Sequence, residues 1–358
     1  MYLNLKKYGL SDRFEQEASL YKNLFPARIT EQHRDLYKVM CEHGELVAGI
    51  SGNLAYHAED LMSFPAVGDW VMIDRTDSTS GNAVIKNILG RKSVFVRQTA
   101  GTSNEQQVVA ANIDTIFICM SLNSDFNVRR IERYLTVAWD SMAAPVIVLT
   151  KSDLCDNLEE KLEELSSVSL GIDVIVCSSE NENGYHDVNN YIAEGKTIAF
   201  IGSSGVGKST LINRLAGDES QAVSEIRSGD DKGKHTTTYR QLKLLPNGGI
   251  VIDTPGMREL QLYSGDLSKT FEDIEEFAVQ CKYKNCSHTS EPGCMVREAI
   301  ENGTLSEKRF KNYQKLQREM EYSNLNSRQT EQEKINRMFG SKKEMKKVMK
   351  QMKSKKGR

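Results

Sequence analysis

The chain has 358 residues, of which 39% are hydrophobic and 27% are charged, and its formal net charge is −2. This composition is ordinary for a globular protein, and at ~150 residues per domain the length predicts two or three domains. No apolar run approaches the ~18 residues that a membrane span needs. Met1–Leu10 also lacks an apolar core of signal-peptide length, so we expect a cytoplasmic protein with no membrane partner.

The charge is unevenly distributed along the chain. Nine Lys or Arg and one Glu lie between Ser341 and Arg358, so this segment carries +8 and the rest of the chain about −10. We expect residues 331–358 to form a basic tail. Such a tail either adds non-specific affinity for RNA phosphates or is simply solvated, and the sequence leaves both readings open.

The first half of the chain predicts an N-terminal extension followed by a small β-barrel. Residues 1–32 form the extension, with a helical pattern around 14–24 and no recognisable chemistry. Residues 33–108 contain short alternating strands between turn residues, which is typical of a small barrel. The candidate strands are Leu36–Cys41, Glu45–Ile50, Asp69–Ile73 and Ala83–Leu89.

Residues 109–265 predict an α/β domain. Buried strands that alternate with helices indicate a mostly parallel sheet covered on both faces. The apolar runs are Thr115–Met120, Val146–Leu149, Asp173–Val176, Thr197–Ile201 and Gly249–Ile252, with amphipathic helices at Val128–Trp139 and Leu158–Leu165. Residues 266–330 are then mainly helical, with clear cases at Phe271–Val279 and Leu305–Glu321.

A complete phosphate-loop motif follows the strand Thr197–Ile201. Residues 202–210 read G-S-S-G-V-G-K-S-T and match G-x-x-x-x-G-K-[ST], and a helical segment comes next. Its glycines let backbone N–H groups wrap phosphates at a helix N-terminus, which a ligand-free turn would not require. Lys208 should contact the β- and γ-phosphates and Ser209 should bind Mg²⁺. The nucleotide-binding residues expected here are Gly202, Ser203, Ser204, Gly205, Val206, Gly207, Lys208, Ser209 and Thr210.

A second phosphate-side motif, D-T-P-G, ends the strand Gly249–Ile252. Asp253 is expected on the Mg²⁺ side of the site, because such folds place an acid at the end of a buried strand. The backbone N–H of Gly256 can then sense the γ-phosphate. Between the two motifs, residues 232–238 read K-G-K-H-T-T-T, a polar loop of first-switch type. One of its threonines, for which Thr237 is our candidate, should complete the Mg²⁺ shell.

Two further loops predict guanine as the base. Thr150-Lys151-Ser152-Asp153 resembles the N-K-x-D motif of GTPases, with Thr in place of Asn. Asp153 can accept two hydrogen bonds from guanine, which adenine cannot donate, and the stem of Lys151 can cover the base. Alone, T-K-x-D fits a solvated turn equally well. Cys177 and Ser178, however, directly follow the next strand, where GTPases place a loop that contacts guanine O6.

The order of these motifs is rotated. Ordinary GTPases have the phosphate loop first and the guanine loops last, whereas here the guanine loops at 150 and 177 precede the phosphate loop at 202. A closed α/β domain tolerates such a circular permutation because its termini lie close together at the surface. The segment after Gly256, the second switch, therefore leads directly into the C-terminal region.

A cysteine-rich segment between the predicted C-terminal helices suggests a metal. Three thiols and one imidazole fall within 281–294, and Cys₃His is a closed structural zinc set with no open position for catalysis. The alternative is a chance grouping of cysteines. The candidate zinc ligands are Cys281, Cys286, His288 and Cys294.

Together these motifs resemble the small ribosomal subunit biogenesis GTPases of the RsgA type, over about residues 35–320. The resemblance rests on T-K-S-D, G-S-S-G-V-G-K-S-T, G-K-H-T-T-T, D-T-P-G-M and C-x-x-x-x-C-x-H with E-P-G-C. It implies an OB-type barrel, a permuted GTPase domain and a zinc domain. It also implies that the protein, as a monomer, binds the small ribosomal subunit and 16S rRNA late in subunit maturation. Thr150, the N-terminal extension and the basic tail depart from the family pattern.

The leading hypothesis is a hydrolytic switch that uses GTP with Mg²⁺, slow alone and stimulated by the ribosomal subunit. The alternative is a nucleotide-sensing RNA-binding module with negligible turnover, because Met257 stands where many GTPases carry a water-orienting Gln. Asp153 and the lack of a substrate-site signature argue against an ATP-using kinase. His235 is the nearest polar candidate for orienting the water, together with Lys208 and Gly256 as catalytic groups. An exposed loop histidine without a catalytic role is the other interpretation of His235.

Overall fold

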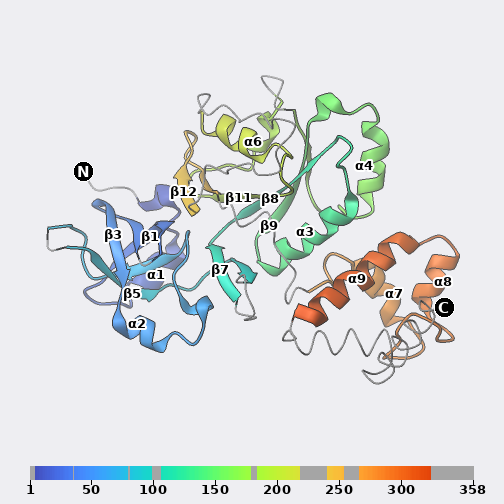
Figure 1. Ribbon diagram of the computed structural model, residues 1–358, viewed down its shortest axis with the longest axis horizontal. Helices are drawn as coiled ribbons and strands as arrows, with labels where there is room; N and C mark the ends of the chain where they lie inside the picture. The colour runs from blue at the N-terminus through green and yellow to red at the C-terminus, as the bar shows by residue number, and fades with distance from the viewer. Residues whose placement is uncertain are drawn as a thin grey trace, which may run out of the picture.

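A computed structural model describes residues 5–34, 36–79, 81–98, 106–178, 184–217, 240–253 and 266–323. Its first part is a small closed barrel (Figure 1). The strands are β1 (Phe25–Gln32), β2 (Tyr37–Cys41), β3 (Gly44–Ile50), β4 (Trp70–Ile73) and β5 (Ala83–Ile88). They pair in the order β1-β2-β3-β5-β4, and β4 pairs back onto β1, which closes the barrel. Short helices accompany it: η1 (Leu5–Tyr8), α1 (Asp12–Ala18), α2 (Gly52–His57) and η2 (Leu61–Ser63).

The barrel begins earlier than the sequence predicted. β1 spans residues 25–32, which we had assigned to an extension ending at residue 32. The reason is that β1 lacks the alternating pattern of a half-buried strand, because Ala27, Arg28, Ile29 and Thr30 are all buried. Arg28, in the middle of the strand, also interrupts the apolar run that a fully buried strand would show.

Arg28 is buried because it joins the barrel to the rest of the protein. Its guanidinium donates to the hydroxyl of Thr197 at 2.8 Å and to the backbone carbonyl of Tyr8, and it lies 5.7 Å from the ring centre of Trp70. Burial lowers the pKa of Arg28 to about 10, while Asp114 and Asp69 oppose that shift, so the group stays charged at neutral pH. These contacts tie the barrel and η1 to the first residue of the strand that precedes the phosphate loop.

The central domain is a doubly covered sheet in the order β10-β9-β8-β11-β13-β12. All neighbours are parallel except β12, which is antiparallel to β13. The strands are β8 (Thr115–Ser121), β9 (Ala144–Thr150), β10 (Val174–Val176), β11 (Thr197–Ile201), β12 (Arg240–Leu244) and β13 (Ile250–Asp253). The helices are α3 (Val128–Asp140), η3 (Ser152–Leu154), α4 (Leu158–Ser166), α5 (His186–Asn189) and α6 (Lys208–Leu215).

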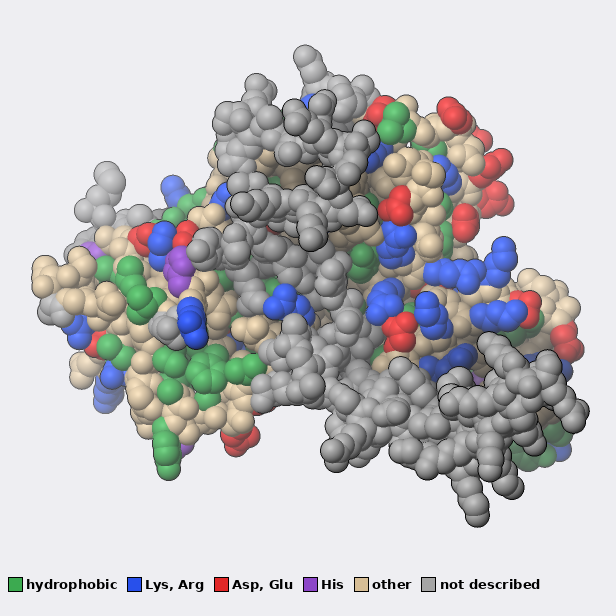
Figure 2. All heavy atoms as spheres, in the orientation of Figure 1, with side chains coloured by type: hydrophobic (Ala, Val, Ile, Leu, Met, Phe, Trp, Pro, Cys, Tyr) green, Lys and Arg blue, Asp and Glu red, His purple; other side chains and the backbone are tan. Residues whose placement is uncertain are grey.

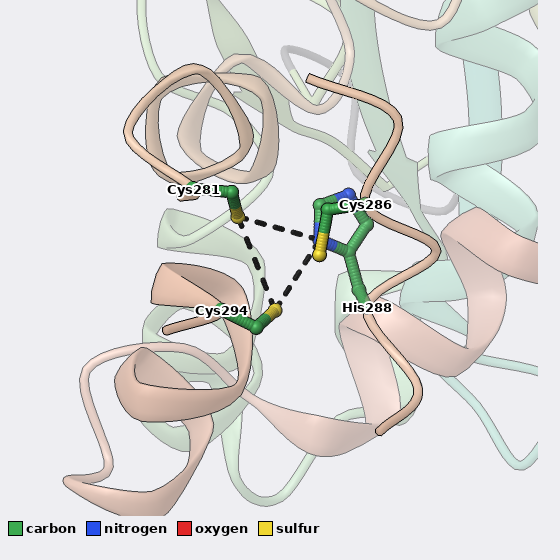
Figure 3. A group of neighbouring side chains, drawn as sticks. All are labelled: Cys281, Cys286, His288 and Cys294. Atoms are coloured by element: carbon green, nitrogen blue, oxygen red, sulfur yellow. Dashed lines mark hydrogen bonds between the residues drawn. The ribbon is translucent and has the colours of Figure 1, made fainter. Parts of the chain in front are cut away.

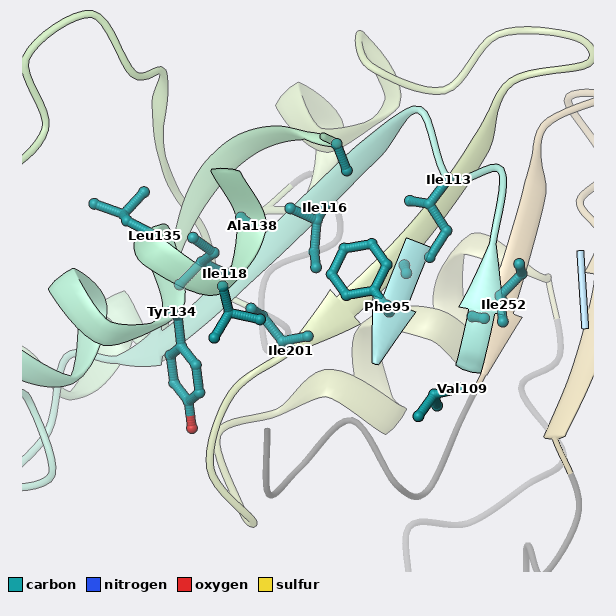
Figure 4. Packing of buried hydrophobic residues seen from close by; sticks show 14 of the residues in the cluster. Phe95, Val109, Ile113, Ile116, Ile118, Tyr134, Leu135, Ala138, Ile201 and Ile252 are labelled. Carbon is teal, nitrogen blue, oxygen red and sulfur yellow. The ribbon is translucent and has the colours of Figure 1, made fainter. Parts of the chain in front are cut away.

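Each face of this sheet has its own apolar core. On one face, Ile116 and Ile118 of β8 pack with Leu135 and Ala138 of α3 (Figure 4). On the other face, a separate cluster joins strand residues such as Phe117 and Phe200 to Leu211 and Leu215 of α6. The near-continuous apolar runs in the sequence follow from this burial on both faces.

The barrel and the central sheet are continuous through β1 and β12. Glu31 pairs with Gln241 and Gln32 with Arg240, so that the described strands form an 11-stranded sheet. A separate hairpin, β6 (Val94–Gln98) with β7 (Gln106–Ala111), contacts η2 beside the barrel, and the N–H of Val94 donates to the carbonyl of Ser141 at the end of α3. The predicted boundary at 108/109 therefore falls inside β7, and the limits of the domains remain a prediction.

The C-terminal helices are α7 (Glu272–Val279), α8 (Met295–Glu301) and α9 (Glu307–Ser323). Helix α9 packs against α3, and α7 packs against α8. Glu132 of α3 is 2% exposed and accepts hydrogen bonds from Arg309 and Asn312 of α9. Arg309 also forms a bidentate pair with Asp273, with both contacts at 2.8 Å. The pair of Arg309 with Glu132 is the buried one, and removing one partner of a buried ion pair costs about 3–5 kcal/mol, so this pair fixes α9 on α3. Among the residues described, no helix is long and apolar enough to cross a membrane.

Candidate nucleotide site and metal centre

The phosphate loop lies between β11 and α6, as the sequence predicted. Gly202, Gly205 and Gly207 all have positive φ angles, of 145°, 77° and 95°. A Cβ atom at Gly202 would also come within 2.3 Å of the carbonyl oxygen of Cys119, so only glycine fits there. Lys208 begins α6, and its ammonium group donates to the carbonyl oxygen of Gly202 at 2.6 Å. The lysine thus lies over the loop that would hold the phosphates.

The two predicted guanine loops meet at one edge of the sheet. They follow the neighbouring parallel strands β9 and β10, whose carboxyl ends lie at the same edge. Ser178 donates a hydrogen bond to the carboxylate of Asp153, and the backbone N–H of Ser152 donates to the carbonyl of Cys177 at 3.2 Å. Lys151 has a left-handed backbone with φ 58°, which turns the chain into η3. Asp153 is an exposed residue, and the hydrogen bond from Ser178 orients its carboxylate.

Thr150 joins the guanine loop to the phosphate loop. Its buried hydroxyl donates to the carbonyl oxygen of Val206 at 2.6 Å. Thr therefore braces the two loops at the position where related motifs carry Asn. The sequence did not reveal this contact, because its partners are 56 residues apart.

Thr150→Val is expected to weaken nucleotide binding by about tenfold. Valine has nearly the same shape but leaves the buried carbonyl of Val206 without its donor, which costs about 1–3 kcal/mol. Titration with a fluorescent GDP analogue measures the change. Thr150→Ser keeps a hydroxyl and serves as the control with near-normal affinity, so equal affinities for the Val and Ser variants would contradict the bracing role.

Asp253 ends β13, and β13 lies beside the strand that leads into the phosphate loop. Its carboxylate is half-buried. Carboxylate and hydroxyl oxygens are the ligands that Mg²⁺ prefers, so Asp253 and Ser209 fit the ion that accompanies GTP. Gly256, Thr237 and His235 lie outside the described residues.

Arg130 is a site residue that the sequence analysis missed. From the first turn of α3, its guanidinium donates to the hydroxyl of Ser203 at 2.7 Å and to Asp125 at 2.8 Å. It therefore contacts the phosphate loop directly. The sequence held no signal for this contact, because the contact depends on β8 being the neighbour of β11 in the sheet.

The four predicted zinc ligands converge on one point (Figure 3). Cys281 follows α7, Cys294 precedes α8, and Cys286 and His288 come from the loop between them. All four ligand atoms lie within 4.8 Å of one another. The Sγ atoms of Cys281 and Cys294 are 3.9 Å apart, and they lie 3.6 and 3.4 Å from Nδ1 of His288. A tetrahedron with Zn–S ≈ 2.3 Å and Zn–N ≈ 2.0 Å has edges of about 3.5–3.8 Å, so these residues fit zinc.

Local electrostatics suit a metal centre as well. Burial lowers the pKa of His288 despite nearby Glu291 and Glu275, which keeps its imidazole neutral and able to bind a cation. Burial alone would raise the pKa of the Cys281 thiol, but backbone N–H groups at the start of α8 outweigh it and lower that pKa. Burial raises the pKa of Cys294 to about 11. A bound dication would supply the stabilisation that this thiolate needs.

Two family models match overlapping parts of the chain. Residues 88–263 match the family described as RsgA GTPase. Residues 185–357 also match the family described as ABC transporter, over a span that includes the phosphate loop.

Sequence similarity to named proteins extends over nearly the whole chain. The chain is 54% identical to small ribosomal subunit biogenesis GTPase RsgA 2 of Lactiplantibacillus plantarum, over 97% of this chain and 98% of that protein. It is 45% identical to RsgA 1 of Listeria innocua, over 89% and 90% of the two chains. The crystal structure of YjeQ from Thermotoga maritima matches with a TM-score of 0.62 at 27% identity, over 83% of this chain and 98% of that one. The structure of YloQ, a circularly permuted GTPase, matches with a TM-score of 0.58 at 24% identity, over 84% and 96%.

Proposed function

The chain belongs to the RsgA family of small ribosomal subunit biogenesis GTPases, and from this membership we propose the roles of its residues. It is a GTP hydrolase of the circularly permuted type that takes part in small-subunit biogenesis. Guanine selection is supported most directly by one observation. Ser178 orients Asp153 in a loop that Thr150 ties to the phosphate loop.

GTP would be held between the two guanine loops and the phosphate loop. Asp153 accepts from the guanine ring, Lys151 covers the base, and backbone N–H groups of the phosphate loop surround the phosphates. The proposed GTP contacts are Thr150, Lys151, Ser152, Asp153, Cys177, Ser178 and Asp253, together with residues 202–210. The proposed Mg²⁺ ligands are Ser209, Asp253 and Thr237. When GTP is bound, the ion would neutralise charge on the β- and γ-phosphates.

For hydrolysis, the chain supplies positive charge and orientation. Binding of phosphate requires Lys208 to leave the carbonyl of Gly202 and turn to the β- and γ-phosphates, where its charge stabilises the transition state. The N–H of Gly256 contacts the γ-phosphate, and His235 orients the attacking water. We propose that the free protein turns over slowly because this catalytic arrangement is completed on the ribosomal subunit.

The cysteine cluster is proposed to hold one structural zinc ion. A Cys₃His set leaves no open position, so the ion would fix the loop between α7 and α8 and take no part in chemistry. In the permuted chain the C-terminal helical region, beginning with α7, follows the second switch, which allows the nucleotide state to act on the C-terminal helices.

We propose that the protein acts as a monomer in the cytoplasm and contacts 16S rRNA. Figure 2 shows Lys and Arg side chains gathered where the C-terminal helices meet the central domain. Helices α3 and α9, which are in contact with each other, carry the exposed basic residues Arg129, Lys308, Lys311, Lys315 and Arg318. Such a cluster fits RNA phosphates, and the basic tail 331–358 would add to it without sequence preference.

Co-sedimentation with purified ribosomal subunits tests this function. The protein is expected to pellet with small subunits in the presence of a non-hydrolysable GTP analogue and to be released when GDP replaces it. Large subunits serve as the control, since we expect no nucleotide-dependent pelleting with them. Equal pelleting with both nucleotides, or with both subunits, would contradict the proposed switch.

A further inference from the structure

A row of polar side chains crosses the joint between the barrel and the central sheet. Gln241 of β12 lies opposite Asp253 of β13 on one side and opposite Glu31 of β1 on the other. Residues directly opposite each other in a sheet share a face, with Cβ atoms about 5 Å apart. The proposed Mg²⁺-side aspartate therefore has Gln241 as its neighbour, and a barrel carboxylate comes next.

The amide of Gln241 is engaged by the barrel. Its Nε2 atom donates to Oε1 of Glu31 at 2.7 Å. The other oxygen of Glu31 lies 3.1 Å from Nζ of Lys38 and 3.3 Å from Nε2 of His33, and the Glu31 side chain is only 14% exposed. The hydrogen bond with Glu31 also raises the pKa of Lys38, so this lysine stays charged. Glu31 is thus fixed within the barrel and fixes the glutamine amide in turn.

The NH₂ group of a glutamine between two carboxylates can face either of them, and here it faces Glu31. Donation to Asp253 would occupy an oxygen lone pair and withdraw negative charge that a hard cation needs. Donation to Glu31 leaves the oxygen atoms of Asp253 to the ion and its water. Which carboxylate receives the amide hydrogen therefore bears on how well Mg²⁺ binds with the nucleotide.

We propose that Glu31 is a positioning residue of the GTPase site: it holds the amide of Gln241 toward the barrel and so keeps Asp253 available to Mg²⁺. This proposal rests on the proposed Mg²⁺·GTP function. It makes the barrel part of the nucleotide site. The strand that carries Gln241 also directly follows the predicted first-switch segment 232–238, and the pairing of β1 with β12 anchors that strand.

Mg²⁺ titrations of nucleotide binding test the proposal without relying on hydrolysis. The affinity for a fluorescent, non-hydrolysable GTP analogue is measured across Mg²⁺ concentrations. Glu31→Ala is expected to raise the half-saturating Mg²⁺ concentration by about three- to tenfold, the effect of one hydrogen bond, while affinity in excess EDTA stays unchanged. Glu31→Gln keeps an acceptor oxygen without the charge, so we expect a smaller shift in the same direction.

Two further variants separate positioning from general stability. Lys38→Met removes the ion pair but keeps the bond between Gln241 and Glu31, so we expect the normal Mg²⁺ requirement. Adding Glu31→Ala to Gln241→Leu should cause no further shift, because the amide that Glu31 restrains is gone. Melting curves confirm that each variant is folded.

Failure of the Mg²⁺ site and failure of the positioning role give different results. If the unmodified protein shows no tightening of analogue binding by Mg²⁺, the proposed Mg²⁺ site itself fails. If Mg²⁺ tightens binding to the unmodified protein while Glu31→Ala leaves the half-saturating Mg²⁺ concentration unchanged, Glu31 has no positioning role. The same conclusion follows if Glu31→Ala raises that concentration equally with and without Gln241→Leu.

Discussion

Asp153→Asn is expected to reverse the nucleotide preference from GTP to xanthosine triphosphate. The carboxylate accepts two hydrogen bonds from guanine, each worth about 1.5–3 kcal/mol because the acceptor is charged, so the GTP affinity should fall by ~100-fold or more. Xanthine carries a 2-oxo group that accepts from the new amide, so its nucleotide should bind better than GTP. Displacement of a fluorescent nucleotide by GTP, ATP and xanthosine triphosphate measures all three affinities.

Asp156→Asn is the matched control for this experiment. It makes the same change on an exposed carboxylate three positions along the same loop and should leave the preference for GTP unchanged. The unmodified protein should reject ATP, because adenine leaves Asp153 without donors. Equal affinities for ATP and GTP in the unmodified protein would refute guanine recognition by Asp153.

Cys286→Ala is expected to cost the protein its zinc. The change removes one of the four ligands. Substitution of a residue that only hydrogen-bonds to a metal ligand typically lowers metal affinity by ~10–100-fold, so loss of a ligand itself should lower it at least as much. The loop between α7 and α8 should then loosen. The C-terminal helices should remain partly folded, because α9 stays fixed to α3 through Glu132 and Arg309. Metal analysis and the melting temperature measure the two effects.

Cys155→Ala controls for the loss of a thiol as such, since Cys155 is half-buried and lies outside the cluster. That variant should keep one zinc per chain. Carefully prepared native protein without zinc, or a Cys286→Ala variant that keeps its full metal content, would show that the cluster is not a zinc site.

Local patterns made most of the central domain predictable. β8, β9 and β11 are buried on both faces, so each appears in the sequence as a continuous apolar run. The barrel strand β1 is also buried on both faces over residues 27–30, but polar residues interrupt its apolar run, and it was missed. It contains the buried Arg28, whose partners are Tyr8 and Thr197, and no local pattern reveals contacts that distant.

In the candidate site, too, local motifs were predictable from the sequence and contacts between distant segments were not. The phosphate loop, the two guanine loops and the Cys₃His set follow fixed spacing rules, and the structure brings the described members of each together. The contacts between segments were not predictable. Thr150 with Val206, Arg130 with Ser203 and Glu31 with Gln241 join residues 56, 73 and 210 positions apart. Their partners are fixed by the order of strands in the sheet, which the sequence alone did not provide.

GTP turnover with and without purified small ribosomal subunits measures whether the protein is a hydrolytic switch that the subunit stimulates. We expect slow hydrolysis by the free protein and marked stimulation by small subunits, but not by large subunits. Lys208→Ala should abolish both rates, and His235→Ala should lose the stimulated rate while keeping GTP binding. GTP binding without turnover above background, even on the small subunit, would contradict a hydrolytic switch and favour a nucleotide-sensing RNA-binding module.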